Sequence, residues 1–238
     1  MPGWYAANNC SAAEASQRYS SYIHLKGYFI CSAEDETSHS PGYNNMHVQF
    51  VKKLHTIGNS WQSKFFSRIM ATDYIVNIST KANMIALKKP GKYPSLAADY
   101  RPVLLLSVWQ KLLECLALQR ISPAVEGLLS PQRAAYQKGR TTYDKVAALT
   151  TFIKNVFQHN LKTAAVFLDL TAVYDTVWQT GLLYKLSKSM PYWFIWLVGV
   201  LLPDRRFRLH LGHDISCWRP KRNGLPQGCV LAPILFNL

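Results

Sequence analysis

The stretch AAVFLDLTAVYDTVW (residues 164–178) places an apolar run directly before two acidic residues. Residues 164–170 show no polar alternation, which is typical of a strand covered on both faces. Asp169 is then expected at the C-terminal end of a buried strand, where an unpaired carboxylate is costly. A divalent cation, which prefers oxygen ligands, would offset that cost, and a capping role in the following turn fits the spacing equally well. Asp175 is expected to be the N-cap of the next helix.

Regular elements are expected on both sides of this stretch. IALKK (85–89) predicts a strand that ends at Pro90-Gly91, and RFRLHL (206–211) alternates and predicts a hairpin extending to residue 218. Thr141 and Asp144 have the spacing of a capping box. Helices are expected from Ser107 to about Arg120, behind Thr141, over 181–188 and over 192–202. Because strands and helices interleave, the predicted fold class is α+β, α/β-like in its order.

The composition indicates a globular chain with a polyanionic partner. At 238 residues a single body could bury roughly 70% of its unfolded surface. Lys plus Arg less Asp plus Glu is 27 − 13 = +14, which excludes an acidic disordered tail. Residues 1–70 contribute 6 − 4 = +2 and residues 71–238 contribute 21 − 9 = +12. The basic character therefore belongs to the second part, and the first part shows no sustained helical or strand period.

Neither the cysteines nor the apolar runs indicate secretion or membrane insertion. The chain has five cysteines, an odd count without a close pair, and no secretory leader is recognised at its start. We therefore expect no disulfide-linked partner and an intracellular location, in the nucleus, the cytoplasm or both. The longest apolar run, 192–202, would rise about 16 Å as a helix, which is too short to cross a bilayer. No membrane partner is expected.

Two further segments carry residues suited to phosphates and bases. In NGLPQGCVLAPILFNL (223–238), glycine and proline predict a tight turn that presents the amide of Gln227 to a ligand. Taken alone, the string Leu-Pro-Gln-Gly is an ordinary loop. In IALKKPGK and DYRPVLLLS (within 85–107), four cations surround a turn, which suits either phosphate binding or a solvated basic face. These cations are Lys88, Lys89, Lys92 and Arg101.

Taken together and in this order, the three segments resemble the reverse transcriptase of non-LTR retrotransposons of the jockey/LINE type. The resemblance runs from about Ile85 to Leu238 and includes LLSVWQKLLE (105–114), QKGRTTYDKVAAL (137–149) and RNGLPQG (222–228). It implies an RNA-directed DNA polymerase with a right-hand fold. The fingers would occupy residues 81–165 and a partial palm residues 166–238. Residues 1–80 form an unmatched N-terminal segment whose order the pattern does not decide.

The resemblance also implies roles for individual residues. Asp169 would be the catalytic carboxylate and would bind two Mg²⁺ ions with the backbone carbonyl of Leu170. Tyr174 falls on the steric-gate position, whose ring excludes a ribose 2′-hydroxyl and so selects dNTPs. The other implied nucleotide-binding residues are Lys89, Arg101 and Gln227. The residues implied to contact the RNA template or the DNA primer are Lys138, Arg140 and Gly228.

The largest departure from the family pattern is the second acidic motif, an aromatic-Ala-Asp-Asp hairpin that would complete the metal site. No such string follows residue 223, so we expect a product truncated before that motif and inactive as an isolated chain. The missing hairpin would also leave residues 164–170 with an open strand edge. The alternative is a non-catalytic, basic nucleic-acid-binding module derived from a mobile element. A chain that never folds stably is the third possibility.

Overall fold

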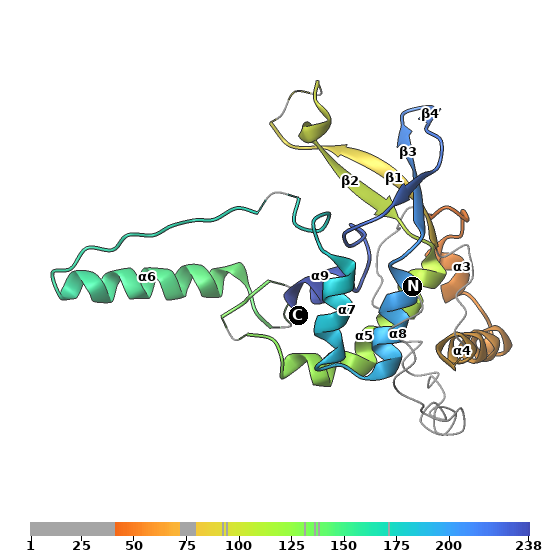
Figure 1. The fold of residues 1–238 in the computed structure, drawn as a ribbon, viewed down its shortest axis with the longest axis horizontal. Helices are drawn as coiled ribbons and strands as arrows, with labels where there is room; N and C mark the ends of the chain where they lie inside the picture. Colours follow the sequence, from red (N-terminus) through yellow and green to blue (C-terminus); the bar gives the residue numbers. More distant parts are fainter. Residues whose placement is uncertain are drawn as a thin grey trace.

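A computed structural model describes residues 41–238 except 72–79 and the single residues 92, 94, 131, 136, 138 and 171. Of the N-terminal segment expected at residues 1–80, only residues 41–71 and 80 are described, and residues 48–52 and 56–71 of it are helical. The fold is mixed α+β, with a small sheet beside a group of helices (Figure 1). The fold class expected from the interleaved pattern is confirmed at this level.

Five strands form one sheet in the order β2-β1-β3-β4, with β5 also paired to β3. β1 pairs antiparallel with β2 and parallel with β3, so the sheet joins segments more than a hundred residues apart. β3 pairs antiparallel with both β4 and β5, which confirms the expected hairpin. The strand expected at 85–89 is longer than its pattern suggested and begins at Lys81. The strands are β1 (Lys81–Lys88), β2 (Tyr100–Leu105), β3 (Arg205–Leu211), β4 (Asp214–Ile215) and β5 (Arg219–Lys221).

The helices expected from the apolar spacing are present, with bounds that differ by a few residues. α6 begins with the capping box: Thr141 Oγ1 accepts from the Asp144 N–H (3.4 Å), and Asp144 accepts from the Thr141 N–H (2.7 Å). The described helices are α3 (Val48–Lys52), α4 (Thr56–Ala71), η2 (Ala97–Asp99), α5 (Val108–Glu126), α6 (Thr142–Gln158), α7 (Gln179–Ser187), α8 (Tyr192–Leu201) and α9 (Ala232–Asn237).

The core lies between α5, α7, α8 and α9 and continues beneath the sheet. α8 is apolar on all sides, and Phe194 and Leu197 are fully buried, as are Ala117 of α5 and Leu231 next to α9. Each large apolar side chain buried in this way contributes about 1.5–3 kcal/mol. No helix in the described part of the chain has the length and apolarity needed to span a membrane.

The prediction of a strand over residues 164–170 is wrong. These residues leave α6 as an extended segment without strand pairing, and Val166, Phe167 and Leu168 are 84%, 84% and 88% exposed (Figure 1). A strand needs a neighbour to receive its backbone hydrogen bonds, and none of the described strands pairs with this segment. The apolar stripe of α6 is likewise largely exposed, and no residue of α6 is buried.

The expected capping role of Asp175 is also wrong. The N-cap of α7 is Trp178, three residues later, and its side chain makes no capping hydrogen bond. The Asp175 carboxylate instead accepts from the ammonium of Lys221 (2.6 Å). Asp175 therefore forms an ion pair with Lys221 of β5 in place of the expected capping hydrogen bond to the backbone of α7.

Candidate functional site

The turn at Tyr174 and the loop at residues 223–228 are joined by backbone hydrogen bonds. The N–H of Leu225 donates to the carbonyl of Tyr174 (2.7 Å), and the N–H of Gly224 donates to the carbonyl of Val177 (3.0 Å). The amide of Gln179 donates to the carbonyl of Gly224 (2.9 Å). The structure therefore brings together two of the segments that the sequence singled out.

Two glycines permit this close approach. Gly224 has φ +80°, and a Cβ there would lie 2.5 Å from the carbonyl oxygen of Tyr174. Gly228 has φ +112°, and a Cβ there would lie 2.5 Å from the carbonyl oxygen of Leu104. Both positions combine left-handed backbone with a gap too narrow for any side chain.

The same loop is bonded to β2, which carries Arg101. The N–H of Leu104 donates to the carbonyl of Gln227 (2.9 Å), so the half-buried Gln227 is fixed beside this strand. Arg101 is exposed and lies opposite Leu87 of β1. All three segments singled out in the sequence thus contribute to one region, joined through β2 and the loop.

The ring of Tyr174 has a defined position. It is half-buried and packs against the ring of Phe236 in α9, with centroids 5.8 Å apart and planes inclined by 59°. Tyr174 also contacts the core at its edge. Because both the backbone and the ring of Tyr174 are fixed by contacts, the ring can limit the size of a group that binds beside it.

Lys89 and Arg101 lie at the loop end of the β1–β2 hairpin. The ammonium of Lys89 donates to the carbonyl of Ala98 (2.8 Å), and its backbone N–H donates to the carbonyl of Asp99 (2.8 Å). Lys89 follows Leu87, the partner of Arg101, by two residues, so both cations belong to the same turn region. The pair offers two positive charges, which suits either of the alternatives that the sequence left open, phosphate binding or a solvated basic face.

Arg140 lines an open pocket of about 650 Å³ at the start of α6. Lys145 and Tyr143 contribute to the same pocket, together with the hydroxyl residues Thr141 and Thr142. Two cations beside an exposed aromatic ring are suited to a nucleic-acid backbone. Lys138, the other residue implied here, lies outside the described residues.

Asp169 and Leu170 are both exposed and belong to the extended segment after α6. The burial expected for Asp169 is therefore wrong. Across the described residues, no group of three or more His, Cys, Asp or Glu side chains could hold a metal ion. One carboxylate and one carbonyl do not fit two adjacent divalent cations, because the mutual repulsion of the ions would be uncompensated.

Sequence reasoning missed Glu114 of α5, which is fully buried. Its Oε2 accepts from the N–H of Val230 (2.7 Å) and from the thiol of Cys229 (2.9 Å). Its Oε1 accepts from the amide of Gln110 (2.6 Å) and lies 4.0 Å from the guanidinium of Arg205. An acidic residue on the apolar side of a predicted helix was the available signal, since a buried charge needs partners.

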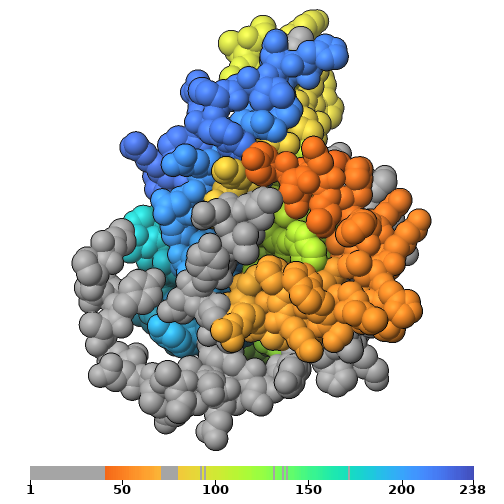
Figure 2. All heavy atoms as spheres, turned by 90° about the vertical axis from the view of Figure 1, so that its right-hand side faces the viewer, coloured from red at the N-terminus to blue at the C-terminus, as the bar shows by residue number. Residues whose placement is uncertain are grey.

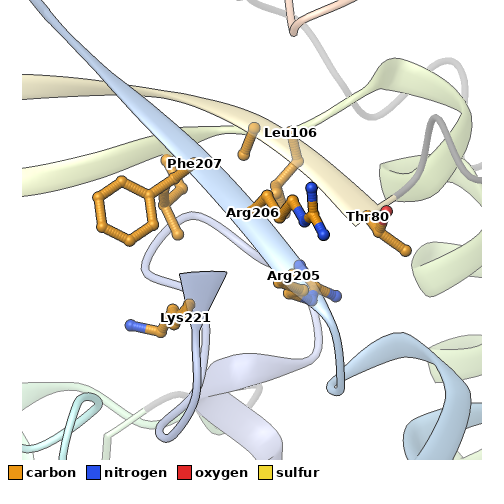
Figure 3. Close-up of a pocket in the computed structure, with 8 residues that line it drawn as sticks. Thr80, Leu106, Arg205, Arg206, Phe207 and Lys221 are labelled. Carbon is orange, nitrogen blue, oxygen red and sulfur yellow. The ribbon is translucent and has the colours of Figure 1, made fainter. Parts of the chain in front are cut away.

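Arg205 borders a small cavity whose wall is formed by residues of the sheet and residues next to its strands (Figure 3). The cavity has a volume of about 10 Å³, and Thr80, Leu106, Phe207 and Lys221 contribute to its wall. That volume is enough for one water molecule at most. The cavity is therefore no site for a nucleotide.

Comparisons with known proteins point to one family. Residues 87–238 match the family described as reverse transcriptase (RNA-dependent DNA polymerase). The chain is 29% identical, over 84% of its length, to a probable RNA-directed DNA polymerase from transposon BS of Drosophila melanogaster. It is 25% identical over 84% to that from mobile element jockey, and 30% identical over 64% to a probable one from transposon X-element, both of the same fly. The chain spans 22%, 22% and 17% of these relatives.

Proposed function

Since the chain belongs to the reverse transcriptase family, of the non-LTR retrotransposon type, we propose that it is part of an RNA-directed DNA polymerase. Residues 81–165 would form its fingers and residues 166–238 part of its palm. The observation that carries this proposal is the joining of the Tyr174 turn to the Gly224–Gly228 loop and to β2. This arrangement unites the segments expected to surround an incoming dNTP.

The proposed nucleotide site uses Tyr174, Gln227, Lys89 and Arg101. The ring of Tyr174, fixed against Phe236, would exclude a ribose 2′-hydroxyl. Lys89 and Arg101 would bind the triphosphate at the end of the β1–β2 hairpin. Gln227 would lie against the new base pair, because its backbone is bonded to β2.

The proposed nucleic-acid contacts come from Arg140 and the loop. Arg140 and Lys145 would bind the RNA template backbone at the start of α6, and Gly228 would let the loop approach the template–primer duplex. Contacts of this kind are independent of base sequence and weaken with salt.

A magnesium ion, when bound, would neutralise charge at the reacting phosphate. We propose this requirement for the polymerase of which the chain would be a part. The described residues do not form a site for two ions, so no catalytic step is assigned to them. We expect the isolated 238-residue polypeptide to bind primer–template and to incorporate no nucleotide. Incorporation by the isolated polypeptide would need further carboxylates beside Asp169.

The test combines binding and incorporation on the purified chain. Fluorescence anisotropy with an RNA-template/DNA-primer duplex is expected to show binding whose logarithmic affinity falls steeply with the logarithm of salt concentration. A labelled-dNTP assay in Mg²⁺ is expected to show no extension. Extension that disappears in Asp169→Ala would contradict the inactivity and establish the metal site. Absence of binding at low salt would contradict the function itself.

A second candidate is the non-catalytic nucleic-acid-binding module. It is favoured by the +12 charge of residues 71–238 and by the exposure of Asp169. Photocrosslinking with a labelled dNTP separates the two, because only the polymerase part is expected to bind a nucleotide beside Tyr174. Crosslinking that is lost in Tyr174→Ala supports the polymerase part, whereas nucleic-acid binding without any crosslink supports the module.

A further inference from the structure

Two cations and two aromatic rings form a cluster apart from the residues discussed above. The rings of Tyr43 and Trp218 meet edge to face, with centroids 5.1 Å apart. The guanidinium of Arg208 lies 5.4 Å and 5.1 Å from the two centroids, and the ammonium of Lys81 lies 5.4 Å and 5.6 Å from them. We refer to these four residues as the Tyr43–Trp218 cluster.

The cluster occupies one face of the sheet. Lys81 of β1 lies opposite Arg206 of β3, and Asn83 lies opposite Arg208, so Lys81, Arg206 and Arg208 project from the same face. Arg206 is exposed, and the cluster residues are half-buried. Figure 2 shows this side of the molecule, where the red-orange atoms that begin at residue 41 border the atoms of β1 and of the blue strand region. The cations are therefore at the surface and partly enclosed.

The electrostatics of the cluster favour an anion. Within the described part of the chain, carboxylates pair with Arg205 and Lys221, and neither Lys81 nor Arg208 has such a partner. The two like charges lie near the same two rings, whose negative faces stabilise both. Arg208 donates through Nε to the side-chain oxygen of Asn83 (3.0 Å), which fixes the guanidinium plane. An incoming phosphate would meet oriented donors and relieve the repulsion between the cations.

We propose that the Tyr43–Trp218 cluster, together with Arg206, is a second nucleic-acid surface that binds the phosphate backbone of single-stranded RNA or DNA. Arg206 and Arg208 are two residues apart on an extended strand, or about 6.7 Å. That repeat is close to the spacing of successive phosphates along a nucleic-acid strand. Aromatic rings beside cations are the usual components of single-strand binding surfaces. This inference rests on the proposed function for the class of its ligand, and it adds a surface separate from the dNTP site.

The test uses the full chain and a short fluorescent oligouridylate. In Lys81→Gln/Arg208→Gln, affinity at low salt is expected to fall about tenfold, and the slope of log affinity against log salt is expected to fall by about 1.4, or 0.7 for each lost phosphate contact. The matched control, Lys64→Gln/Lys185→Gln, removes the same charge from exposed positions on α4 and α7. It is expected to change the slope by less than half as much.

Two further variants keep the test decisive if the double variant folds poorly. Arg206→Gln, at an exposed position, is expected to lower the slope by about 0.7. Trp218→Leu keeps every charge and is expected to lower affinity at an unchanged slope. Steep salt dependence in the parent chain, with equal losses in cluster and control variants, would overturn this inference alone. Absence of oligouridylate binding by a parent chain that still binds the primer–template duplex would also overturn this inference alone, whereas absence of both would overturn the proposed function as well.

Discussion

Glu114 accepts a hydrogen bond from the backbone N–H of Val230 (2.7 Å), although the two residues are 116 positions apart. The bond fixes the segment after the Gly224–Gly228 loop against the middle of α5. Because Glu114 is 0% exposed, its charge is balanced by these hydrogen bonds and by Arg205. The position of the loop therefore depends on one buried carboxylate.

Removal of this carboxylate is expected to be costly. Glu114→Ala leaves Arg205 without its counter-charge and Val230 without its acceptor, so the free energy of unfolding should fall by about 3–5 kcal/mol. Glu114→Gln keeps an acceptor and should cost less. Urea unfolding followed by circular dichroism measures both. Glu126→Ala, exposed at the end of the same helix, is the control and should stay within about 0.5 kcal/mol of the parent. A Glu114→Ala effect as small as the control would contradict this role.

The close contact at Gly228 predicts a cost beyond that of its backbone conformation. Gly212 also has positive φ (+60°), but a Cβ there would meet nothing within 4 Å. Gly212→Ala should therefore cost only about 1–2 kcal/mol for left-handed backbone. Gly228→Ala should cost clearly more, because its Cβ meets the Leu104 carbonyl and displaces Gln227. Thermal unfolding of both variants gives the difference, and equal costs would show that the loop can move aside.

The sequence predicted correctly those elements whose partners lie nearby in the chain. Its predictions were wrong where the structure of a segment depends on contacts with segments far away in the chain. The capping box at Thr141 and Asp144 is confirmed, because all its partners lie within four residues. The strand at 164–170 is wrong, because an apolar run shows a preference for burial and cannot supply the strand beside it. Asp169 was expected to be buried and is exposed, yet the family is shown by the match over residues 87–238. The family was predicted from the order of the motifs along the chain, and that prediction did not depend on the burial of Asp169.

The exposed apolar segment after α6 is expected to cause self-association. Phe167 is 84% exposed, so Phe167→Lys should raise the concentration at which the protein aggregates. The free energy of unfolding should stay within about 0.5 kcal/mol of the parent value. Light scattering during a concentration series and urea unfolding measure the two effects. Phe194→Ala, at a position with 0% exposure, is the contrast and should cost about 3–5 kcal/mol. A large loss of stability in Phe167→Lys would mean that this segment packs against the body in solution.

The thiol of Cys229 is expected to resist alkylation until the protein unfolds. Burial, and next the negative charge of Glu114, raise the pKa of Cys229 well above its ordinary value. In the unfolded chain the thiol ionises near pH 8.5, so this contribution to stability is present below that pH and is lost as pH rises above it. Pulse labelling with iodoacetamide, followed by mass spectrometry, should show that among the described cysteines the exposed Cys217 is modified first and Cys229 last. Rapid labelling of Cys229 under native conditions would contradict the burial of this thiol.

Helix α6 should lose its N-terminal stabilisation in acid. The backbone N–H of Thr141, and next its hydroxyl, donate to the carboxylate of Asp144 and lower the pKa of that group below its ordinary value. The unfolded chain binds its proton near pH 3.9, so the contribution is complete above that pH and is lost as pH falls through the lower folded value. Carboxyl ¹³C NMR should give a midpoint below the ordinary value, and amide exchange in the first turn of α6 should accelerate over the same range. Thr141→Val removes both hydrogen bonds of the hydroxyl, the one to the carboxylate and the one from the N–H of Asp144, and keeps the bond from the backbone N–H of Thr141. It should therefore return part of the pKa shift, and an unchanged midpoint would mean that the hydroxyl does not contribute to it.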